Sequence, residues 1–214
     1  MNLEEQLASG LAELDLPLDA AVQQRLLKYV ALLQKWNKVY NLTAVRDPQK
    51  MLVQHLFDSL AVLPQIHGRR IIDVGTGPGL PGVPLALANP ALDVTLLDSN
   101  HKKTTFLRQA CLELGLSNAT VVCERVEAWR PGEKYDVVIS RAFSDLAEFA
   151  NLTRHLCSDS GVMLAMKGVY PNEELARLPA CVALQSVGQL RVPSLDAERH
   201  LVVLRPVETE ATIV

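Results

Sequence analysis

The sequence predicts an α/β fold, a mostly parallel sheet with an antiparallel edge, preceded by a helical N-terminal extension. Up to residue 68, apolar residues recur at helical spacing and no strand-like alternation is present. Beyond that point, short runs rich in Val, Ile and Leu alternate with amphipathic stretches, which is typical of a parallel sheet covered by helices on both faces. We therefore expect an extension over residues 1–68 and a second domain over residues 69–214.

Composition sets limits on the class of protein. The chain has 214 residues, of which 49% are hydrophobic, and its formal net charge is -3. A pI near 6.0 is unlike that of a general nucleic-acid binder. No apolar run approaches the roughly 18 residues of a membrane helix, and the start, MNLEEQLASG, is acidic where a secretory signal is basic. We expect a cytoplasmic protein without a membrane segment.

The spacing of the cysteines predicts neither a metal site nor a redox site. The four cysteines are scattered along the chain and none forms a CxxC pair. Zinc and redox motifs need close spacing, because two ligands must converge on one ion or one disulfide. We therefore predict reduced, buried thiols and no metal.

Two helices are expected in the extension. Apolar residues from Leu26 to Trp36 recur every three or four positions, and Asp47-Pro48 is a start signal for a second helix that ends at Pro64. Between Arg25 and Lys50 the chain has six basic residues and one acidic residue. This basic stretch is either a surface for a polyanion or a solvated helix face. The aromatic residues Tyr29, Trp36 and Tyr40 favour a core over stacking on bases, because they lie at helical spacing.

The second domain is expected to alternate strands with helices. The predicted strands are RIIDV (70–74), DVTLLD (93–98), ATVVCE (119–124), YDVVIS (135–140) and GVMLAMK (161–167). The predicted helices are LPGVPLALA (80–88), HKKTTFLRQACLELG (101–115), SDLAEFANLTRHL (144–156) and NEELARL (172–178). The last two apolar runs, 182–193 and 199–206, are joined by a short connection, which predicts the antiparallel edge.

The glycine-rich stretch IIDVGTGPGLPG (71–82) follows the first predicted strand, where open parallel sheets bind ligands. The literal pattern GxGxxG begins at Gly77, but dinucleotide folds place its first glycine at the strand end, which here is Gly75. Asp73 would repel a pyrophosphate and attract the amino and sulfonium groups of S-adenosylmethionine. The stretch therefore predicts an S-adenosylmethionine site. Asp98, at the end of the second strand, is placed to accept hydrogen bonds from ribose hydroxyls, as in NAD sites.

Two further strand ends complete the predicted nucleoside pocket. Val126 and Glu127 follow the third strand, where a backbone N–H and a carboxylate can bind the edge of adenine. A surface role for Glu127 remains an alternative. Arg141 follows the fourth strand, near the expected position of methyl transfer, and is the candidate for positioning.

The stretch after the fourth strand excludes two classes of methyl acceptor. Ser140-Arg141-Ala142-Phe143 stands where enzymes acting on exocyclic amines carry an Asn/Asp-Pro-Pro-aromatic motif, and the chain has no Pro-Cys for attack on cytosine C5. The remaining acceptors include guanine N7, whose free lone pair needs no general base. We therefore assign no catalytic acid or base.

Five stretches carry a resemblance to a known family: WNKVYNLTAVRDP, DVGTGPGLPG, LLDSNHKKTTFLR, ISRAF and LDAERHLVVL. Together they resemble the bacterial glucose-inhibited division protein B family, also called ribosomal RNA small subunit methyltransferase G. The resemblance implies a Rossmann-like fold and N7-methylation of one guanine in 16S ribosomal RNA with S-adenosylmethionine. It implies cofactor contacts at Gly75, Leu80, Val126, Glu127 and Arg141; we add Gly77 and Asp98 on mechanism.

The expected partner is 16S ribosomal RNA or the small ribosomal subunit, bound by a monomer through shape and a few basic contacts. The RNA-binding candidates are Lys102, Lys103, Arg108, Lys167 and Arg199, with His200 weighed against a packing role. Three alternatives remain: a small-molecule methyltransferase, a regulator that binds S-adenosylmethionine without turnover, and a nicotinamide-dependent dehydrogenase. The last is disfavoured by the loop register and by Asp73.

Overall fold

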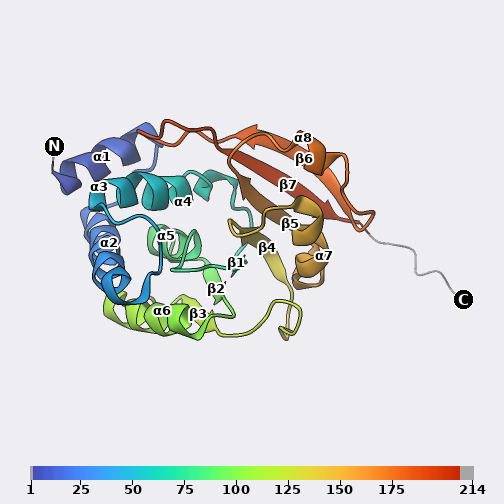
Figure 1. Cartoon of the computed structure of the whole chain (residues 1–214), viewed down its shortest axis with the longest axis horizontal. Coiled ribbons are helices and arrows are strands. Elements are labelled where there is room, and N and C mark those ends of the chain that lie inside the picture. Colours follow the sequence, from blue (N-terminus) through green and yellow to red (C-terminus); the bar gives the residue numbers. More distant parts are fainter. Residues whose placement is uncertain (1, 208–214) are drawn as a thin grey trace, which may run out of the picture.

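A computed structural model describes residues 2–207, so Met1 of the predicted extension and residues 208–214 of the predicted second domain lie outside it. Within the described residues the chain forms one seven-stranded sheet with strand order β3-β2-β1-β4-β5-β7-β6 (Figure 1). The strands are β1 (Arg70–Val74), β2 (Asp93–Leu97), β3 (Ala119–Val122), β4 (Tyr135–Ser140), β5 (Cys157–Lys167), β6 (Val182–Gln189) and β7 (His200–Pro206). The first five strands pair in parallel, and β7 pairs antiparallel with β5 and β6. The predicted sheet with an antiparallel edge is confirmed.

Strand β1 lies between β2 and β4. Strands β2 and β3 follow on one side of β1, and β4 and β5 follow on the other side. Asp73 on β1 pairs with Leu96 on one side and Ile139 on the other. The loops that follow β1 and β4 therefore leave the same edge of the sheet side by side. This switch in strand order is where open α/β sheets bind ligands.

The extension begins with α1 (Leu3–Glu13) and α2 (Ala20–Tyr40). Asn2 and Glu5 form a capping box on α1, and the Asp19 carboxylate accepts from Val22 N at the start of α2. Helix α2 packs against α6 (His101–Leu114). Arg25, near the start of α2, contacts Leu114 at the end of α6, so the two helices run antiparallel.

The second predicted helix of the extension begins where expected but changes its hydrogen-bonding pattern. It comprises α3 (Pro48–Met51), a π-helical segment η1 (Leu52–Phe57) and α4 (Asp58–Leu60), and a 3₁₀ turn η2 (Leu63–Gln65) follows. The Asp47 carboxylate caps the start, as the sequence predicts. The π-helical segment was not predicted, because its residues have the same apolar spacing as an α-helix. Such segments are frequent at functional sites.

The remaining helices are α5 (Gly82–Ala88), α7 (Leu146–Thr153), the 3₁₀ turn η3 (Arg154–Leu156) and α8 (Asn172–Leu175). The expected helix over 80–88 starts two residues later, because the glycine loop continues to Pro81. The expected helix over 172–178 ends at Leu175, ahead of Pro179, a residue type that disfavours helix just before it. Strand β5 starts at Cys157 instead of Gly161.

The extension and the sheet share one apolar core. A single buried cluster joins Leu7 of α1 and Leu33 of α2 to Phe57, Val94 of β2 and Phe106 of α6. A second cluster covers the other face of the sheet, beneath α7. Figure 1 shows the extension, in blue and cyan, beside α5 and α6. The predicted boundary at residue 68 thus falls in a connection, while the packing continues across it. No helix within residues 2–207 is both long and apolar enough to span a bilayer.

Candidate active site

A cavity of about 390 Å³ lies at the carboxyl ends of β1, β2, β3 and β4. Its volume falls within the range of about 300–1,000 Å³ that is usual for small-molecule sites. The loops after all four strands contribute to its wall: Gly75 after β1, Asp98 after β2, Val126 and Glu127 after β3, and Ala142 after β4. These include four of the seven residues that the sequence nominates for cofactor binding.

The other three nominated residues are placed differently. Leu80 is buried beneath the glycine loop, with 2% of its surface exposed. The backbone N–H of Gly77 donates to Asp98, and the guanidinium of Arg141 is directed toward the extension. None of the three is among the residues that line the cavity.

The glycine loop turns sharply over the end of the sheet. Gly75 and Gly77 have φ angles of 68° and 60°, a backbone region that side chains disfavour. A Cβ on Gly75 would lie 2.8 Å from Ala142 Cβ, whereas one on Gly77 would meet no atom closer than Gly75 O at 4.0 Å. The backbone at Gly77 therefore presents open space that a bound ligand can approach.

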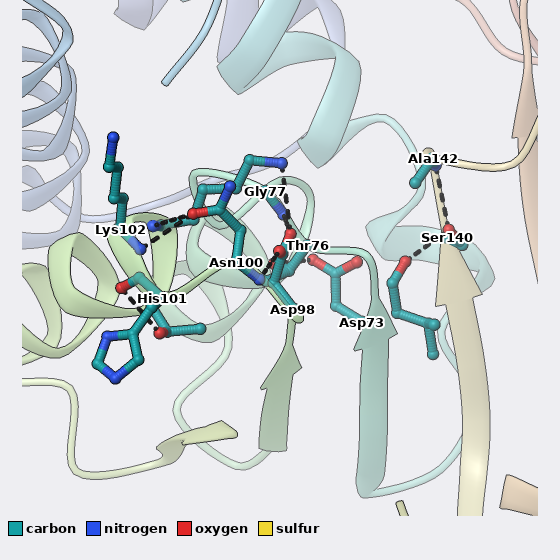
Figure 2. A network of polar contacts seen from close by, with 12 residues as sticks. Asp73, Thr76, Gly77, Asp98, Asn100, His101, Lys102, Ser140 and Ala142 are labelled. Atoms are coloured by element: carbon teal, nitrogen blue, oxygen red, sulfur yellow. Dashed lines mark hydrogen bonds and ion pairs between the residues drawn. The ribbon is translucent and has the colours of Figure 1, made fainter. Parts of the chain in front are cut away.

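The ends of β1 and β4 are tied together by a serine. Ser140 Oγ donates to Val74 O at 2.6 Å and accepts from Ala142 N at 3.1 Å (Figure 2). This contact holds the segment after β4 against the glycine loop, which fixes one wall of the cavity.

The sequence predicts that Asp73 attracts the cofactor directly, but the structure does not place Asp73 in the cavity wall. It is fully buried under the loop, where Oδ2 accepts from Thr76 Oγ1 at 2.6 Å (Figure 2). The same oxygen accepts from Gly82 N at 2.8 Å. Burial raises its pKa to about 6, against the lowering effect of the two hydrogen bonds. Asp73 therefore fixes the shape of the loop from below.

Asp98 does face the cavity. Its Oδ2 accepts from Gly77 N at 2.9 Å and lies 3.6 Å from Lys103 Nζ, while Oδ1 accepts from Asn100 N at 2.8 Å (Figure 2). These contacts hold the carboxylate in one orientation with lone pairs left over for a ligand. Lys103, which the sequence nominates for RNA, also lines the cavity.

A buried carboxylate that the sequence analysis missed anchors two nominated arginines. Asp58 is 1% exposed; Oδ2 accepts from Arg141 Nη1 and Oδ1 from Arg199 Nε, both at 2.8 Å. Arg141 Nη1 also donates to Gln54 O at 3.0 Å. The available signal was an acidic residue inside the apolar segment MLVQHLFDSLAVL. Periodicity alone does not reveal which distant cations will meet it.

His55 lies next to this group in the π-helical segment. Its Nε2 is 3.0 Å from Thr43 Oγ1, and Nδ1 has no partner within the described residues. Burial, together with the nearby charge of Arg141, lowers its pKa to about 4. The ring is neutral at physiological pH.

Some of the remaining candidates for RNA binding are exposed, and others are already bound to groups of the same chain. Lys102 and Arg108 are exposed on α6. Lys167 Nζ donates to Ser144 O at 2.7 Å and pairs with Glu174 at 2.9 Å, and its side chain is only 11% exposed. His200 is a packing residue, since it is buried with Nδ1 3.0 Å from Gly168 O.

The basic stretch of the extension is partly structural. Arg25 donates to Leu114 O and Gly115 O, and Lys28 donates to Glu113 O, at the end of α6. Cations at this position satisfy free carbonyls and the helix dipole.

Of the three aromatic residues of α2, Tyr29 belongs to the core and Trp36 packs against it, as the sequence favoured, whereas Tyr40 is exposed, which corrects that expectation. Tyr29 is fully buried and donates to Pro78 O in the glycine loop at 2.8 Å. Trp36 stacks on Tyr40 and packs against Phe106.

Of the four cysteines, Cys157 is buried and the other three are partly buried, so the prediction of buried thiols holds fully for Cys157 alone. The four cysteines are free, and burial raises the pKa of Cys157 to about 12 and that of Cys111 to about 11. Within residues 2–207, no group of three or more His, Cys, Asp or Glu residues is arranged to hold a metal ion.

Comparison with known proteins assigns the family. The family model GidB, described as rRNA small subunit methyltransferase G, matches residues 22–202. The chain belongs to this family. It is 60% identical over 204 residues to the ribosomal RNA small subunit methyltransferase G of Laribacter hongkongensis, covering 95% of this chain and 99% of the relative. It is 55% identical over 212 residues to the protein of the same name from Nitrosospira multiformis, covering 96% and 98%.

A solved structure supports the fold. The chain resembles an S-adenosylmethionine-dependent methyltransferase from Thiobacillus denitrificans, crystallised with S-adenosyl-L-homocysteine, with a TM-score of 0.55 and 12% identity. The match covers 71% of this chain and 91% of that one. The predicted Rossmann-like methyltransferase fold is thereby confirmed.

Proposed function

We propose that the chain transfers the methyl group of S-adenosylmethionine to N7 of a guanine in 16S ribosomal RNA. The observation that carries the proposal is the cavity at the switch in strand order, in a chain whose family is named for small-subunit ribosomal RNA methylation. The cavity presents a glycine loop, an anchored carboxylate after β2 and a carboxylate after β3. These groups suit an adenosine that carries a charged amino acid. The open backbone at Gly77 leaves room for such a ligand.

Each cofactor residue then has a role that its position supports. Gly75 and Gly77 offer close backbone approach, and Leu80 supports the loop from beneath. Asp98 accepts from ribose hydroxyls, and Val126 with Glu127 binds the adenine edge. Arg141 lies next to Ala142 of the cavity wall and reaches toward the extension, where it pairs with Asp58. The cofactor supplies a methyl group on a sulfonium, already activated for transfer.

Methyl transfer to guanine N7 requires alignment of the base with the methyl group and no proton transfer. Guanine N7 has a free lone pair, so the chain needs to orient the base and exclude water.

RNA binding is assigned to the basic side chains around the cavity. Lys102, Lys103 and Arg108 lie on α6, whose first turn borders the cavity. We propose that they contact phosphates of 16S ribosomal RNA or of the small subunit, with the chain acting as a monomer in the cytoplasm. Lys167 is a weaker candidate than the sequence suggested, because its ammonium is held by Glu174.

The test uses tritiated-methyl S-adenosylmethionine and small-subunit RNA from cells that lack this enzyme. After digestion to nucleosides, we expect the label in 7-methylguanosine, and none in RNA from cells that carry the enzyme. Label in another nucleoside would contradict the N7 assignment. Cofactor binding without RNA labelling would instead favour a small-molecule methyltransferase or a non-catalytic sensor.

A further inference from the structure

Two arginines from distant parts of the chain share one carboxylate beside the cofactor cavity. Arg141 follows β4, Arg199 precedes β7, and Asp58 begins α4 of the extension. The side chain of Asp58 is 2% exposed, whereas those of Arg141 and Arg199 are 27% and 25% exposed. The carboxylate is thus a buried anchor, and both arginine side chains are partly exposed.

The anchor leaves hydrogen-bonding capacity on the two arginines. Arg141 uses Nη1 for Asp58 and Gln54 O, and Arg199 uses Nε for Asp58 and Nη1 for Glu198 O. Within residues 2–207, Arg141 Nε and Nη2 and Arg199 Nη2 have no acceptor. Two guanidinium charges also face one carboxylate charge. Partly exposed arginine side chains with free N–H donors are a common means of binding an oxyanion.

The position of the pair distinguishes it from the cofactor cavity. Ala142, next to Arg141, lines the cavity, but neither arginine does. Arg199 precedes His200, which pairs with Lys167 at the carboxyl end of β5. The pair therefore lies at the carboxyl edge of the sheet, displaced from the cavity toward β5 and β7. An oxyanion bound there would lie outside the cavity and next to its Ala142 wall.

We propose that Asp58 is a positioning residue that holds Arg141 and Arg199 together as one site for a phosphate of the RNA strand that carries the acceptor guanine. The inference rests on the proposed function and adds to it a specific contact and the residue that organises it. A phosphate fixed at this edge would set the register of the strand, so that the acceptor base reaches the cavity.

The test measures RNA and cofactor affinities separately. Asp58→Asn keeps the size of the side chain but places an amide N–H₂ against one guanidinium, and Arg199→Gln removes one cation. We expect each variant to raise the dissociation constant for small-subunit RNA by about 10-fold, with the constant for S-adenosylhomocysteine within two-fold of wild type. The slope of log affinity against log salt should fall by about one in Arg199→Gln, and Arg199→Lys should restore part of the affinity.

The matched control is Asp136→Asn, at the opposite edge of the sheet, where the carboxylate accepts from Arg69 N and Arg70 N. It should leave RNA affinity and the salt slope unchanged. An unchanged salt slope in Arg199→Gln would overturn the phosphate site, even if Asp58→Asn did not fold. Equal weakening of S-adenosylhomocysteine and RNA binding would overturn it in favour of the cofactor's carboxylate. Failure of the wild-type chain to bind or methylate RNA would instead count against the proposed function.

Discussion

Asp73 and Asp98 show how burial gives two neighbouring carboxylates different tasks. Asp73 lies one residue before the end of β1, and Asp98 directly follows β2 at the same edge of the sheet. The Oδ2 atom of each accepts a backbone N–H, from Gly82 at the start of α5 and from Gly77 in the glycine loop. Asp98 borders the cavity, whereas Asp73 is completely enclosed and its Oδ1 has no partner within residues 2–207. Enclosure makes the charge of Asp73 costly, and the chain tolerates this cost beneath the proposed cofactor loop.

Replacing Asp73 by Asn should therefore stabilise the protein at neutral and higher pH. The folded-state pKa of Asp73 is raised from 3.8 to about 6, so its contribution to stability is present below pH 3.8 and lost as pH rises through 6. The gain in unfolding free energy from Asp73→Asn should be larger at pH 8 than at pH 4, on the order of 1–3 kcal/mol. Denaturant unfolding at the two pH values measures it.

The same variant should bind S-adenosylhomocysteine or S-adenosylmethionine more weakly, because a negative charge under the loop is removed. The loop itself should persist, since an amide oxygen can still accept from Thr76 and Gly82. A gain in stability that is equal at both pH values would contradict the assigned cause.

Gly77 allows a second comparison at the scale of single residues. Gly77→Ala and Gly115→Ala both place a side chain at positive φ, 60° and 62°, and neither added Cβ meets an atom closer than 4.0 Å. Each should lose on the order of 1 kcal/mol of stability. Only Gly77→Ala should weaken cofactor binding, because Gly77 lies in the glycine loop and donates to Asp98 in the cavity wall, whereas Gly115 ends α6. Isothermal titration with S-adenosylhomocysteine distinguishes them; equal affinities would count against ligand approach at Gly77.

At the scale of elements, the antiparallel contact between α2 and α6 divides the basic residues into two groups. Those at the start of α2 bind the carbonyl end of α6, whereas Lys102 and Lys103 stand at the start of α6, beside the cavity. Asn100 caps that start by accepting from Lys102 N and Lys103 N. One helix pair thus uses its cations for stability at one end, and we propose that it uses those at the other end to contact RNA.

Substitutions at the two ends should have opposite effects. Arg25→Gln should lose about 1 kcal/mol of stability, because two carbonyls of the α6 terminus lose their donor, with RNA affinity unchanged. Lys102→Gln should leave thermal stability unchanged and weaken RNA binding, with the salt slope reduced by about one. Thermal unfolding and filter binding at several salt concentrations test the pair. A loss of RNA affinity in Arg25→Gln would show that the whole basic stretch contacts RNA.

At the scale of the whole molecule, the extension and the sheet are expected to unfold together. Leu7, Leu33 and Phe57 belong to the same buried cluster as Val94 and Phe106. Asp58 adds an ionic connection from the extension to the ends of β4 and β7. Separate folding of residues 69–207 would expose this shared apolar surface.

The fluorescence of the two tryptophans can follow the unfolding of the extension and of the second domain separately. Trp36 lies in the extension and Trp129 in the second domain, where its Nε1 donates to Tyr135 Oη. In the variants Trp36→Phe and Trp129→Phe, the remaining tryptophan should give the same urea midpoint. Saturating S-adenosylhomocysteine should shift both midpoints equally. An earlier transition at Trp36 would indicate that the extension is an independent unit.

The sequence by itself determined the order and kind of the elements, the antiparallel edge and the residues at the ends of the parallel strands. These follow from local patterns: apolar periodicity, glycine and proline placement, and the common direction of parallel strands. It also placed Gly75, Asp98, Val126 and Glu127 together, because parallel strand ends meet at one edge.

Only the tertiary structure decided which charges are buried and which meet. The ion pairs of Asp58 join residues 83 and 141 positions apart, and the enclosure of Asp73 depends on the loop that folds over it. The use of Arg25 as a cap arises in the same way, from a contact between α2 and α6. Burial and pairing depend on neighbours that are remote along the chain, so no local pattern encodes them.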